Sequence, residues 1–147
     1  MAKNGVDPLT GQKTVNLIED GIESTFNFFD KGKPGLFNDI GDGGIYDSIL
    51  YDENGNQVGF TTTEFVFVKE LGNDTFKAEI TNTLNFGNDN TITLGGTINV
   101  QKFEALKPAN IDIIGGTGIY DDVRGKATIN QLQLNVLDEV GISLQII

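Results

Sequence analysis

The stretch Thr75-Phe76-Lys77-Ala78-Glu79-Ile80-Thr81-Asn82-Thr83-Leu84-Asn85-Phe86 carries the clearest strand pattern of this chain. Its even-numbered residues are mostly apolar, whereas its odd-numbered residues are Thr, Lys, Glu and Asn. Because successive side chains of a strand point to opposite faces, this alternation predicts a half-buried strand. One face is expected to lie in a core and the other in water.

Similar short stretches rich in Val, Ile, Thr, Phe and Tyr lie on both sides of this segment, separated by Gly, Asn and Asp. This composition is typical of strands joined by tight turns. It predicts strands at about 14–20, 24–30, 44–51, 57–69, 75–86, 91–102, 110–114, 124–135 and 140–147. The turns at 52–56, 71–74 and 87–90 place Asn, Asp and Gly where hairpins need a positive φ. Neighbouring strands are therefore expected to be antiparallel and consecutive.

No helical pattern is long enough to cover the face of a sheet, so the strands must close on themselves or pair as a sandwich to avoid unpaired edges. We predict an all-β fold, an eight-stranded antiparallel up-and-down β-barrel. The length of 147 residues fits one domain over residues 1–147. Residues 1–13 are expected to form a flexible tail. The Gly-rich segment 31–44 is expected to cross one barrel end, either as a functional loop or as a plain connection.

The composition excludes several kinds of chemistry. The chain has no Cys and no His, which excludes disulfides, Cys/His zinc sites, haem ligation by His, thiol nucleophiles and Ser-His-Asp triads. Twenty-one acidic residues against ten basic ones give a net charge of -11, which repels phosphate backbones and anionic headgroups. Nucleic acid and membrane surfaces are therefore not expected partners. A signal peptide pattern is absent from the chain as given, and a cytoplasmic protein is expected.

The acidic turns raise the question of a calcium site, because carboxylate and amide oxygens are hard ligands. Segment 52–56 resembles part of an EF-hand loop, but its Gly is misplaced, a closing Glu is missing and no helices flank it. Ordinary hairpin turns explain these residues better, and no metal site is predicted.

A second distinctive segment is Ile111-Asp112-Ile113-Ile114-Gly115-Gly116-Thr117-Gly118-Ile119-Tyr120-Asp121-Asp122-Val123-Arg124-Gly125-Lys126-Ala127-Thr128-Ile129. Its glycines permit a backbone with positive φ and are expected to end one strand tightly. The segment resembles the GGTG turn and the following strand of the allene oxide cyclase and dirigent superfamily. Weaker matches to the same superfamily lie upstream, in the same order, at 41–46, 57–61, 75–79 and 94–96. Together the matches cover about Asp42 to Leu132.

The resemblance implies a barrel whose interior, open at one end, holds a small apolar or amphipathic molecule. Members of the superfamily either cyclise a reactive intermediate or hold radicals for stereoselective coupling. Neither reaction requires a metal or an organic cofactor, so none is expected here. The resemblance also implies a homodimer or homotrimer formed through outer sheet faces. Leu132, Leu134 and Val136 are candidates for such a face, with lumen lining as the alternative.

The resemblance carries site residues over from plant-type cyclases with changes. Glu19 matches the carboxylate of the first strand. The Asn of the second strand falls at Ser48, and the Cys of the third falls near Phe65. Because both polar groups are altered, the fatty-acid epoxide of the plant enzymes is not the expected substrate.

Dirigent proteins supply a second set of matches. Asp20 and Asp47 resemble two of their acids, and Arg124 matches their Arg. The Asp that follows GGTG in dirigent proteins is Ile119 here, and this departure weakens the case for their coupling reaction. Arg124 is expected either to clamp an anionic group of a substrate or to pair with a neighbouring acid of its own turn.

The residues themselves also suggest roles. In a barrel, inward and outward side chains alternate, and the resemblance selects Tyr46 and Ser48 as inward, with Asp47 outward as a solvated or interface charge. Tyr46 and Ser48 would then hydrogen-bond an oxygen of the ligand. Glu19, Asp20 and Glu64 are acids beside apolar neighbours, where burial would raise the pKa and create a general acid or base near neutral pH. The alternative is that each acid is a charge at a strand end or on the outer face.

Three functions remain open at this point. The first is a cofactor-independent cyclase or isomerase, with Glu19, Asp20 and Arg124 as catalytic candidates and with a substrate-binding set of Tyr46, Asp47, Ser48, Glu64 and Phe65. The second is a non-catalytic dirigent-like or lipocalin-like binding barrel. The third is an interaction module whose lumen is filled by its own side chains. An apolar cavity with Glu19 or Asp20 buried inside it would favour the enzyme.

Overall fold

The computed structural model of the chain describes residues 14–29, 40–72, 75–133 and 136–147. The predicted tail 1–13 and most of segment 31–44 lie outside these ranges. Within them the chain forms one short helix, α1 (Val100–Glu104), two 3-10 turns, η1 (Glu23–Thr25) and η2 (Gly118–Tyr120), and nine strands. The strands are β1 (Thr14–Gly21), β2 (Asn27–Phe29), β3 (Gly43–Asp52), β4 (Gln57–Gly72), β5 (Thr75–Asn85), β6 (Thr91–Asn99), β7 (Ala109–Thr117), β8 (Gly125–Gln133) and β9 (Val136–Ile146).

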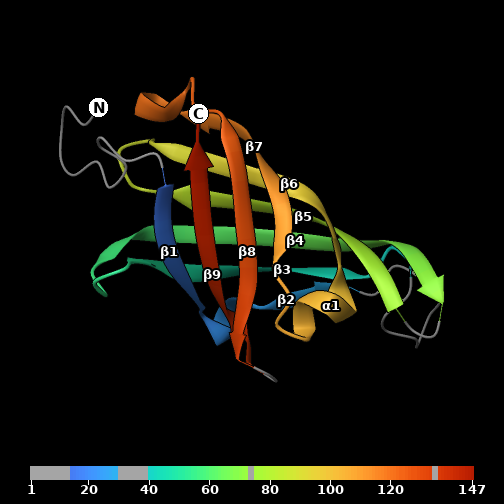
Figure 1. Cartoon of the computed structure of the whole chain (residues 1–147). Helices are drawn as coiled ribbons and strands as arrows, with labels where there is room; N and C mark the ends of the chain where they lie inside the picture. Colours follow the sequence, from blue (N-terminus) through green and yellow to red (C-terminus); the bar gives the residue numbers. More distant parts are fainter. Residues whose placement is uncertain (1–13, 30–39, 73–74, 134–135) are drawn as a thin grey trace.

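Eight of these strands form a closed antiparallel barrel (Figure 1). From β3 to β9 each strand pairs with the next one in the chain, and β1 pairs with both β9 and β3 to close the ring. The extra strand β2 continues along the edge of β3 that β1 leaves free, pairing with Gly43–Ile45, whereas β1 pairs with Ser48–Asp52. The prediction of an eight-stranded up-and-down barrel is confirmed.

The predicted hairpin turns at 52–56 and 87–90 also form, whereas residues 73–74 of the third predicted turn lie outside the described ranges. Gly55 and Gly87 have positive φ angles of 82° and 87°, and Asn88 and Asp89 follow at 55° and 61°. Asp52 accepts backbone hydrogen bonds from Asn54 and Asn56, each at 2.9 Å. These bonds, with that of Asn56 foremost, lower the pKa of the Asp52 carboxyl. Asp52 therefore stabilises its own turn.

Two predicted strands are shorter in the structure. Among the described residues 24–29, the strand β2 takes up three, because η1 occupies Glu23–Thr25. The strand predicted at 91–102 ends at Asn99, whose side chain accepts a hydrogen bond of 3.1 Å from the backbone N–H of Lys102. That bond caps the first turn of α1 and turns the chain out of the sheet.

The glycine cluster behaves differently from the prediction. Gly115 and Gly116 do not end a strand but lie within β7, where they pair with Thr93 and Ile92. Only Gly118 of the three has a positive φ, of 64°. A Cβ atom on Gly118 would lie 2.1 Å from Oδ1 of Asn90, so the close approach of the β5–β6 turn requires glycine there.

The core fills one half of the barrel. Its fully buried side chains lie toward the turns at 52–56 and 87–90, and they are Leu17, Leu50, Leu84, Ile92, Leu94, Ile142 and Leu144. The other half ends at α1, which packs against β5, β6 and β8 (Figure 1). Among the described helices, none is long and apolar enough to cross a membrane. The barrel is thus solid at one end, and the end near α1 is where space is left for a ligand.

Candidate functional site

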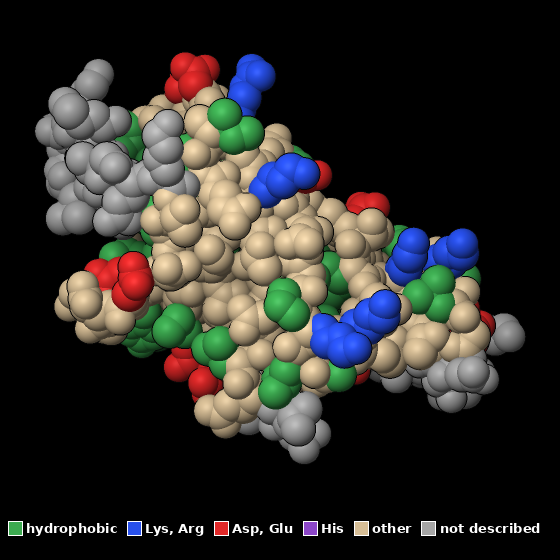
Figure 2. All heavy atoms as spheres, viewed as in Figure 1, with side chains coloured by type: hydrophobic (Ala, Val, Ile, Leu, Met, Phe, Trp, Pro, Cys, Tyr) green, Lys and Arg blue, Asp and Glu red, His purple; other side chains and the backbone are tan. Residues whose placement is uncertain are grey.

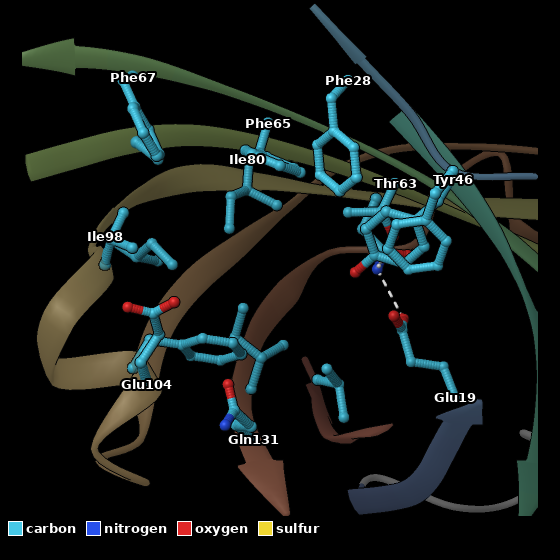
Figure 3. Close-up of a pocket in the computed structure, with 17 residues that line it drawn as sticks. Glu19, Phe28, Tyr46, Thr63, Phe65, Phe67, Ile80, Ile98, Glu104 and Gln131 are labelled. Atoms are coloured by element: carbon cyan, nitrogen blue, oxygen red, sulfur yellow. Dashed lines mark hydrogen bonds between the residues drawn. The ribbon is translucent and has the colours of Figure 1, made fainter. Parts of the chain in front are cut away.

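A cavity of about 420 Å³ opens in the half of the barrel near α1 (Figure 3). This volume lies within the range of small-molecule sites in proteins, roughly 300–1,000 Å³. Most of its lining is apolar, and the complete set is Glu19, Phe26, Phe28, Tyr46, Thr63, Phe65, Phe67, Ala78, Ile80, Asn82, Ile98, Val100, Phe103, Glu104, Ile129, Gln131 and Val140. The predicted third function, which needs a lumen filled by side chains, does not fit this interior.

One side of the cavity is an aromatic wall made of Phe26, Phe28, Tyr46, Phe65 and Phe67. The rings of Phe26 and Tyr46 are stacked, with centroids 4.4 Å apart and planes 4° from parallel. The ring of Phe28 meets that of Phe65 edge to face at 6.3 Å. These contacts hold the rings against one another, so the wall offers a fixed surface to a ligand.

The floor of the cavity is polar and centres on Glu19. Its Oε1 accepts a hydrogen bond of 2.7 Å from Nδ2 of Asn82 (Figure 3), and the same Nδ2 donates to Oγ1 of Thr63 at 3.0 Å. Asn82 and Thr63 are a cross-strand pair of β4 and β5. Three strands, β1, β4 and β5, thus fix the position of the carboxyl group.

Burial gives Glu19 an unusual pKa. The side chain is only 1% exposed, and this desolvation raises the pKa of the carboxyl to about 7 against the hydrogen bond from Asn82 and the nearby Thr61 hydroxyl. The Thr61 hydroxyl lowers the pKa of Glu19 only by lying near the carboxyl, since its oxygen makes no hydrogen bond to another described group. Near neutral pH, protonated and ionised Glu19 are therefore both populated. A carboxyl in this condition can serve as a general acid or as a general base.

The alternation of β1 explains why Glu19 is inside. Val15, Leu17 and Glu19 are buried, while the residues between them are exposed. Leu17 belongs to the packed half of the barrel, and Glu19 is the next inward residue toward α1. The carboxyl therefore sits at the boundary between the solid core and the cavity.

A second carboxyl reaches the cavity from another element. Glu104, at the end of α1, lines it, and partial burial raises the pKa of Glu104. On β8, Gln131 lines the cavity too, and its Nε2 donates to the backbone oxygen of Gln133 at 2.8 Å. The position of α1 is fixed by Gln101, whose Oε1 accepts from the backbone N–H of Phe76 at 2.8 Å.

Of the eight predicted site residues, the structure brings Glu19, Tyr46 and Phe65 together in the cavity. Ser48 points inward on the same face of β3 as Tyr46, but it is fully buried in the packed half and does not line the cavity. Leu50, the next inward residue of β3, belongs to the core that fills this half. A direct contact between Ser48 and a ligand is therefore not supported.

The other four predicted residues lie elsewhere. Asp20 and Glu64 are exposed, because each neighbours an inward residue of its strand and so points outward. Asp47 also lies outside, where its Oδ1 accepts a hydrogen bond of 2.8 Å from Thr62. Arg124 is exposed just before β8, at the end of the barrel that the core fills. None of the four lines the cavity.

Several lining residues were not predicted from the sequence. Asn82 offered a signal, since it is the one polar residue on the otherwise apolar face of its strand. Gln131 follows Ala127 and Ile129 on the inward face of β8 and offered the same kind of signal. Glu104 offered none, because its segment was not predicted as a helix. Among the described residues no three acidic side chains lie close enough together to hold a metal ion.

Known proteins share this architecture. Residues 29–144 match the family described as allene oxide cyclase barrel like domain. Among curated proteins, none matches the sequence significantly.

Solved structures give three informative neighbours. A pyocyanin demethylase is 25% identical and superposes with a TM-score of 0.71 over 91% of this chain and 99% of its own. An exo-specific intermolecular Diels-Alderase is 17% identical, with a TM-score of 0.68 over 89% of this chain and 96% of its own. A pterocarpan synthase dirigent protein is 16% identical, with a TM-score of 0.65 over 90% and 91%. The last two likenesses show a shared fold.

Proposed function

Because this chain belongs to the allene oxide cyclase barrel-like family, we propose that it is a cofactor-independent cyclase or isomerase. In this proposal the barrel lumen binds a small apolar or amphipathic reactive intermediate and controls the stereochemistry of its cyclisation. One observation carries the proposal: Glu19 is buried at the floor of an apolar cavity, with a pKa of about 7. The solved structure described as an exo-specific intermolecular Diels-Alderase has the same fold, which supports this choice.

The aromatic wall supplies the first part of the mechanism. A flexible substrate packed against Tyr46 and Phe65 loses conformers that place its reacting atoms apart. When binding holds two reacting groups in the right geometry, their translational and rotational entropy is lost before the reaction step. This lowers the barrier by up to about 7–11 kcal/mol in the best oriented cases. A cyclisation controlled in this way gives one stereoisomer, because the rigid wall admits one folded form of the substrate.

Glu19 supplies the second part. Protonated Glu19 donates to a carbonyl or epoxide oxygen of the substrate as negative charge develops there, and ionised Glu19 then removes a proton from the product-forming intermediate. Glu19 is thus protonated again at the end of the cycle, and no net proton is gained or lost. Asn82 is a positioning residue, since its hydrogen bond of 2.7 Å orients the carboxyl. A general acid or base of this kind contributes roughly 10²–10⁴-fold in rate.

A second candidate function is a non-catalytic dirigent-like or lipocalin-like barrel. The largely apolar lining of the cavity supports it, and so does the dirigent protein with the same fold. Such a protein would hold a ligand in one conformer without proton transfer. Glu19 would then serve only as a hydrogen-bond partner, and its replacement by Gln would leave the product unchanged.

The test is product analysis on chiral columns after incubation with polyene, epoxide and phenolic intermediates. Pyocyanin belongs in the panel because of the demethylase with the same fold. We expect Glu19→Gln to slow product formation by roughly 10²–10⁴-fold on the substrate that responds. The matched control is Asp20→Asn, which removes a carboxyl from the exposed face of the same strand and should leave the rate unchanged.

Three outcomes separate the candidates. A stereochemical bias lost in Glu19→Gln and kept in Asp20→Asn supports the enzyme. A bias kept in both variants supports the dirigent-like barrel. Saturable binding with the same product mixture in the presence and absence of protein supports a lipocalin-like carrier and rejects catalysis.

A further inference from the structure

The two side-chain amides that line the cavity, Asn82 and Gln131, leave their acceptor oxygens unused. Both N–H groups of the Asn82 amide are used, one by Glu19 and one by Thr63. The Gln131 amide nitrogen donates to the backbone of Gln133. Of the polar atoms of these two amides, the oxygens have no partner: Oδ1 of Asn82 and Oε1 of Gln131 are buried and, among the described residues, accept no hydrogen bond.

Such unpaired acceptors are costly in a folded protein. Asn82 is 5% exposed and Gln131 is 1% exposed, and a buried acceptor without a donor keeps its full desolvation penalty. Both residues line the cavity. A ligand that brings hydrogen-bond donors removes this penalty, whereas a ligand that brings only acceptors does not.

The charged residues of the cavity lining also disfavour a ligand that brings only acceptors. Glu19 and Glu104 are its two ionisable acids, and no Lys or Arg is among the described residues that line the cavity. Figure 3 shows these two carboxyl groups entering from separate elements, β1 and α1. Lys102 and Lys107, which flank Glu104 in the sequence, are exposed and outside the lining. An anionic ligand would meet like charges at the buried Glu19 and the exposed Glu104, and a cationic ligand would meet opposite ones.

The aromatic wall adds a third attraction. The faces of aromatic rings attract cations, and the attraction is strongest where water is excluded. The same rings pack well against a flat apolar body. The net charge of -11 favours the approach of a cation over that of an anion as well.

We propose that the cavity selects ligands in which a flat apolar body carries a positively charged, donor-bearing nitrogen, and that Glu104 and Gln131 set this preference. The apolar body lies on the aromatic wall. The nitrogen group donates to the Gln131 oxygen and the Glu104 carboxylate. This proposal names the class of ligand that the cavity binds. It rests on the proposed function only because both use the same cavity.

The test uses three naphthalene probes that differ only in one group: 2-naphthylmethylamine as the cation, 2-naphthalenemethanol as the neutral ligand and 2-naphthoate as the anion. Isothermal titration calorimetry at low ionic strength and pH 7.5 measures their affinities for the full chain. We expect the amine to bind tightest and 2-naphthoate weakest. Roughly two- to fivefold should separate the amine from the alcohol, the range of an exposed ion pair.

Variants locate the preference. Glu104→Gln should lower the affinity for the amine about two- to fivefold and leave that for the alcohol unchanged. Gln131→Leu should lower the affinities for both donor-bearing probes and spare 2-naphthoate. The matched control is Glu64→Gln, which removes the same charge from the outer face of β4 and should change none of the three affinities.

The proposal is overturned if 2-naphthoate binds as tightly as the amine, if Glu104→Gln affects all three probes equally, or if none of the probes binds at millimolar concentration. Its failure is distinct from that of the proposed function, because these are equilibrium affinities without turnover. Glu19→Gln should keep the preference for the amine while losing product formation.

Discussion

At the scale of single residues, Glu19 and Asp20 show how much a strand's alternation decides. The two acids are adjacent in the sequence, yet Glu19 lines the cavity and Asp20 is exposed. Their side chains point to opposite faces of β1, and only the inward position is surrounded by apolar groups. Chemistry near neutral pH is therefore available to Glu19 through its burial.

The raised pKa of Glu19 predicts a pH-dependent stability. With a pKa of about 7 in the folded state against 4.5 for an ordinary Glu, the folded protein holds its proton longer than the unfolded one does. The stabilisation is complete below about pH 4.5 and is lost as the pH rises through about 7, by roughly 3 kcal/mol in all. Urea unfolding of wild type and Glu19→Gln between pH 4 and pH 9 measures it. The wild type should lose stability relative to the variant over this range, and a constant difference would contradict the assignment.

Asn82 predicts a change in the same titration. Its hydrogen bond lowers the pKa of Glu19, so Asn82→Leu should move that pKa further upward. The variant should also lose about 1–3 kcal/mol of stability, because Thr63 and Glu19 lose a buried donor. Carbon NMR titration of the labelled Glu side chains follows the pKa directly. Thr83→Val, on the opposite face of β5, is the control and should leave the titration of Glu19 in place.

At the scale of elements, two short segments set the ends of the barrel. The helix α1 lies over the end with the cavity and brings Glu104 to it. Gly118 begins η2 at the other end, beside the β5–β6 turn, and the backbone N–H of Ile119 donates to Oδ1 of Asn90 at 3.0 Å. Both segments depend on a particular residue, Asn99 as the helix cap and Gly118 as the turn.

Gly115 of β7 and Gly118 of η2 give a matched pair of substitutions. Gly118→Ala should destabilise the protein by about 1–3 kcal/mol, because the residue has a φ of 64° and its Cβ would meet Asn90. Gly115→Ala should change stability by less than about 0.5 kcal/mol, because nothing lies within 4 Å of its Cβ position. Thermal unfolding of both variants is the measurement. Equal losses would mean that neither the backbone angle nor the contact with Asn90 matters.

These elements also mark the limits of prediction from sequence. The strands that alternate regularly, such as β5, were predicted within one or two residues, because period two is a local property. The end of β6 was predicted too late, because the β-branched Val100 continues the strand composition beyond Asn99. Asn99 ends the strand because its side chain accepts a hydrogen bond from Lys102. The composition of the segment does not show this bond.

At the scale of the whole molecule, the barrel combines a solid core with a hollow. The inward side chains toward the turns at 52–56 and 87–90 are packed, and those toward α1 surround the cavity. A dense core supplies the stability that an empty cavity cannot, since cavity walls lose packing contacts. The division therefore allows one small domain to be stable and to hold a ligand.

The outer surface bears on the predicted homodimer or homotrimer. Figure 2 shows that apolar side chains reach the surface at several places on one face of the molecule. Phe60 is 51% exposed, and Ile18 and Ile45 are exposed on the neighbouring strands β1 and β3. Of the face predicted from the sequence, Leu132 is exposed, whereas Leu134 and the side chain of Val136 lie outside what the structure describes. The oligomer stays a prediction.

Light scattering after size exclusion checks it. We expect a mass two or three times the 15.9 kDa of one chain. Phe60→Lys and Leu132→Lys test the two candidate faces separately, and the variant that yields a monomer identifies the interface, because a buried unpaired charge disfavours association. A wild type that remains at the mass of one chain at micromolar concentration would reject the prediction.

The sequence by itself determined the barrel class, the hairpin turns and the exclusion of His and Cys chemistry, because alternation, turn composition and residue inventory are local properties. It also pointed to Glu19, Tyr46 and Phe65. Only the tertiary structure decided which acids are buried and which residues meet across the lumen. Asn82 and Glu19 lie 63 positions apart in the chain and share a hydrogen bond, and Glu104 reaches the cavity only because α1 leaves the sheet. Such meetings depend on ring closure and on where packing stops, which no short stretch of sequence contains.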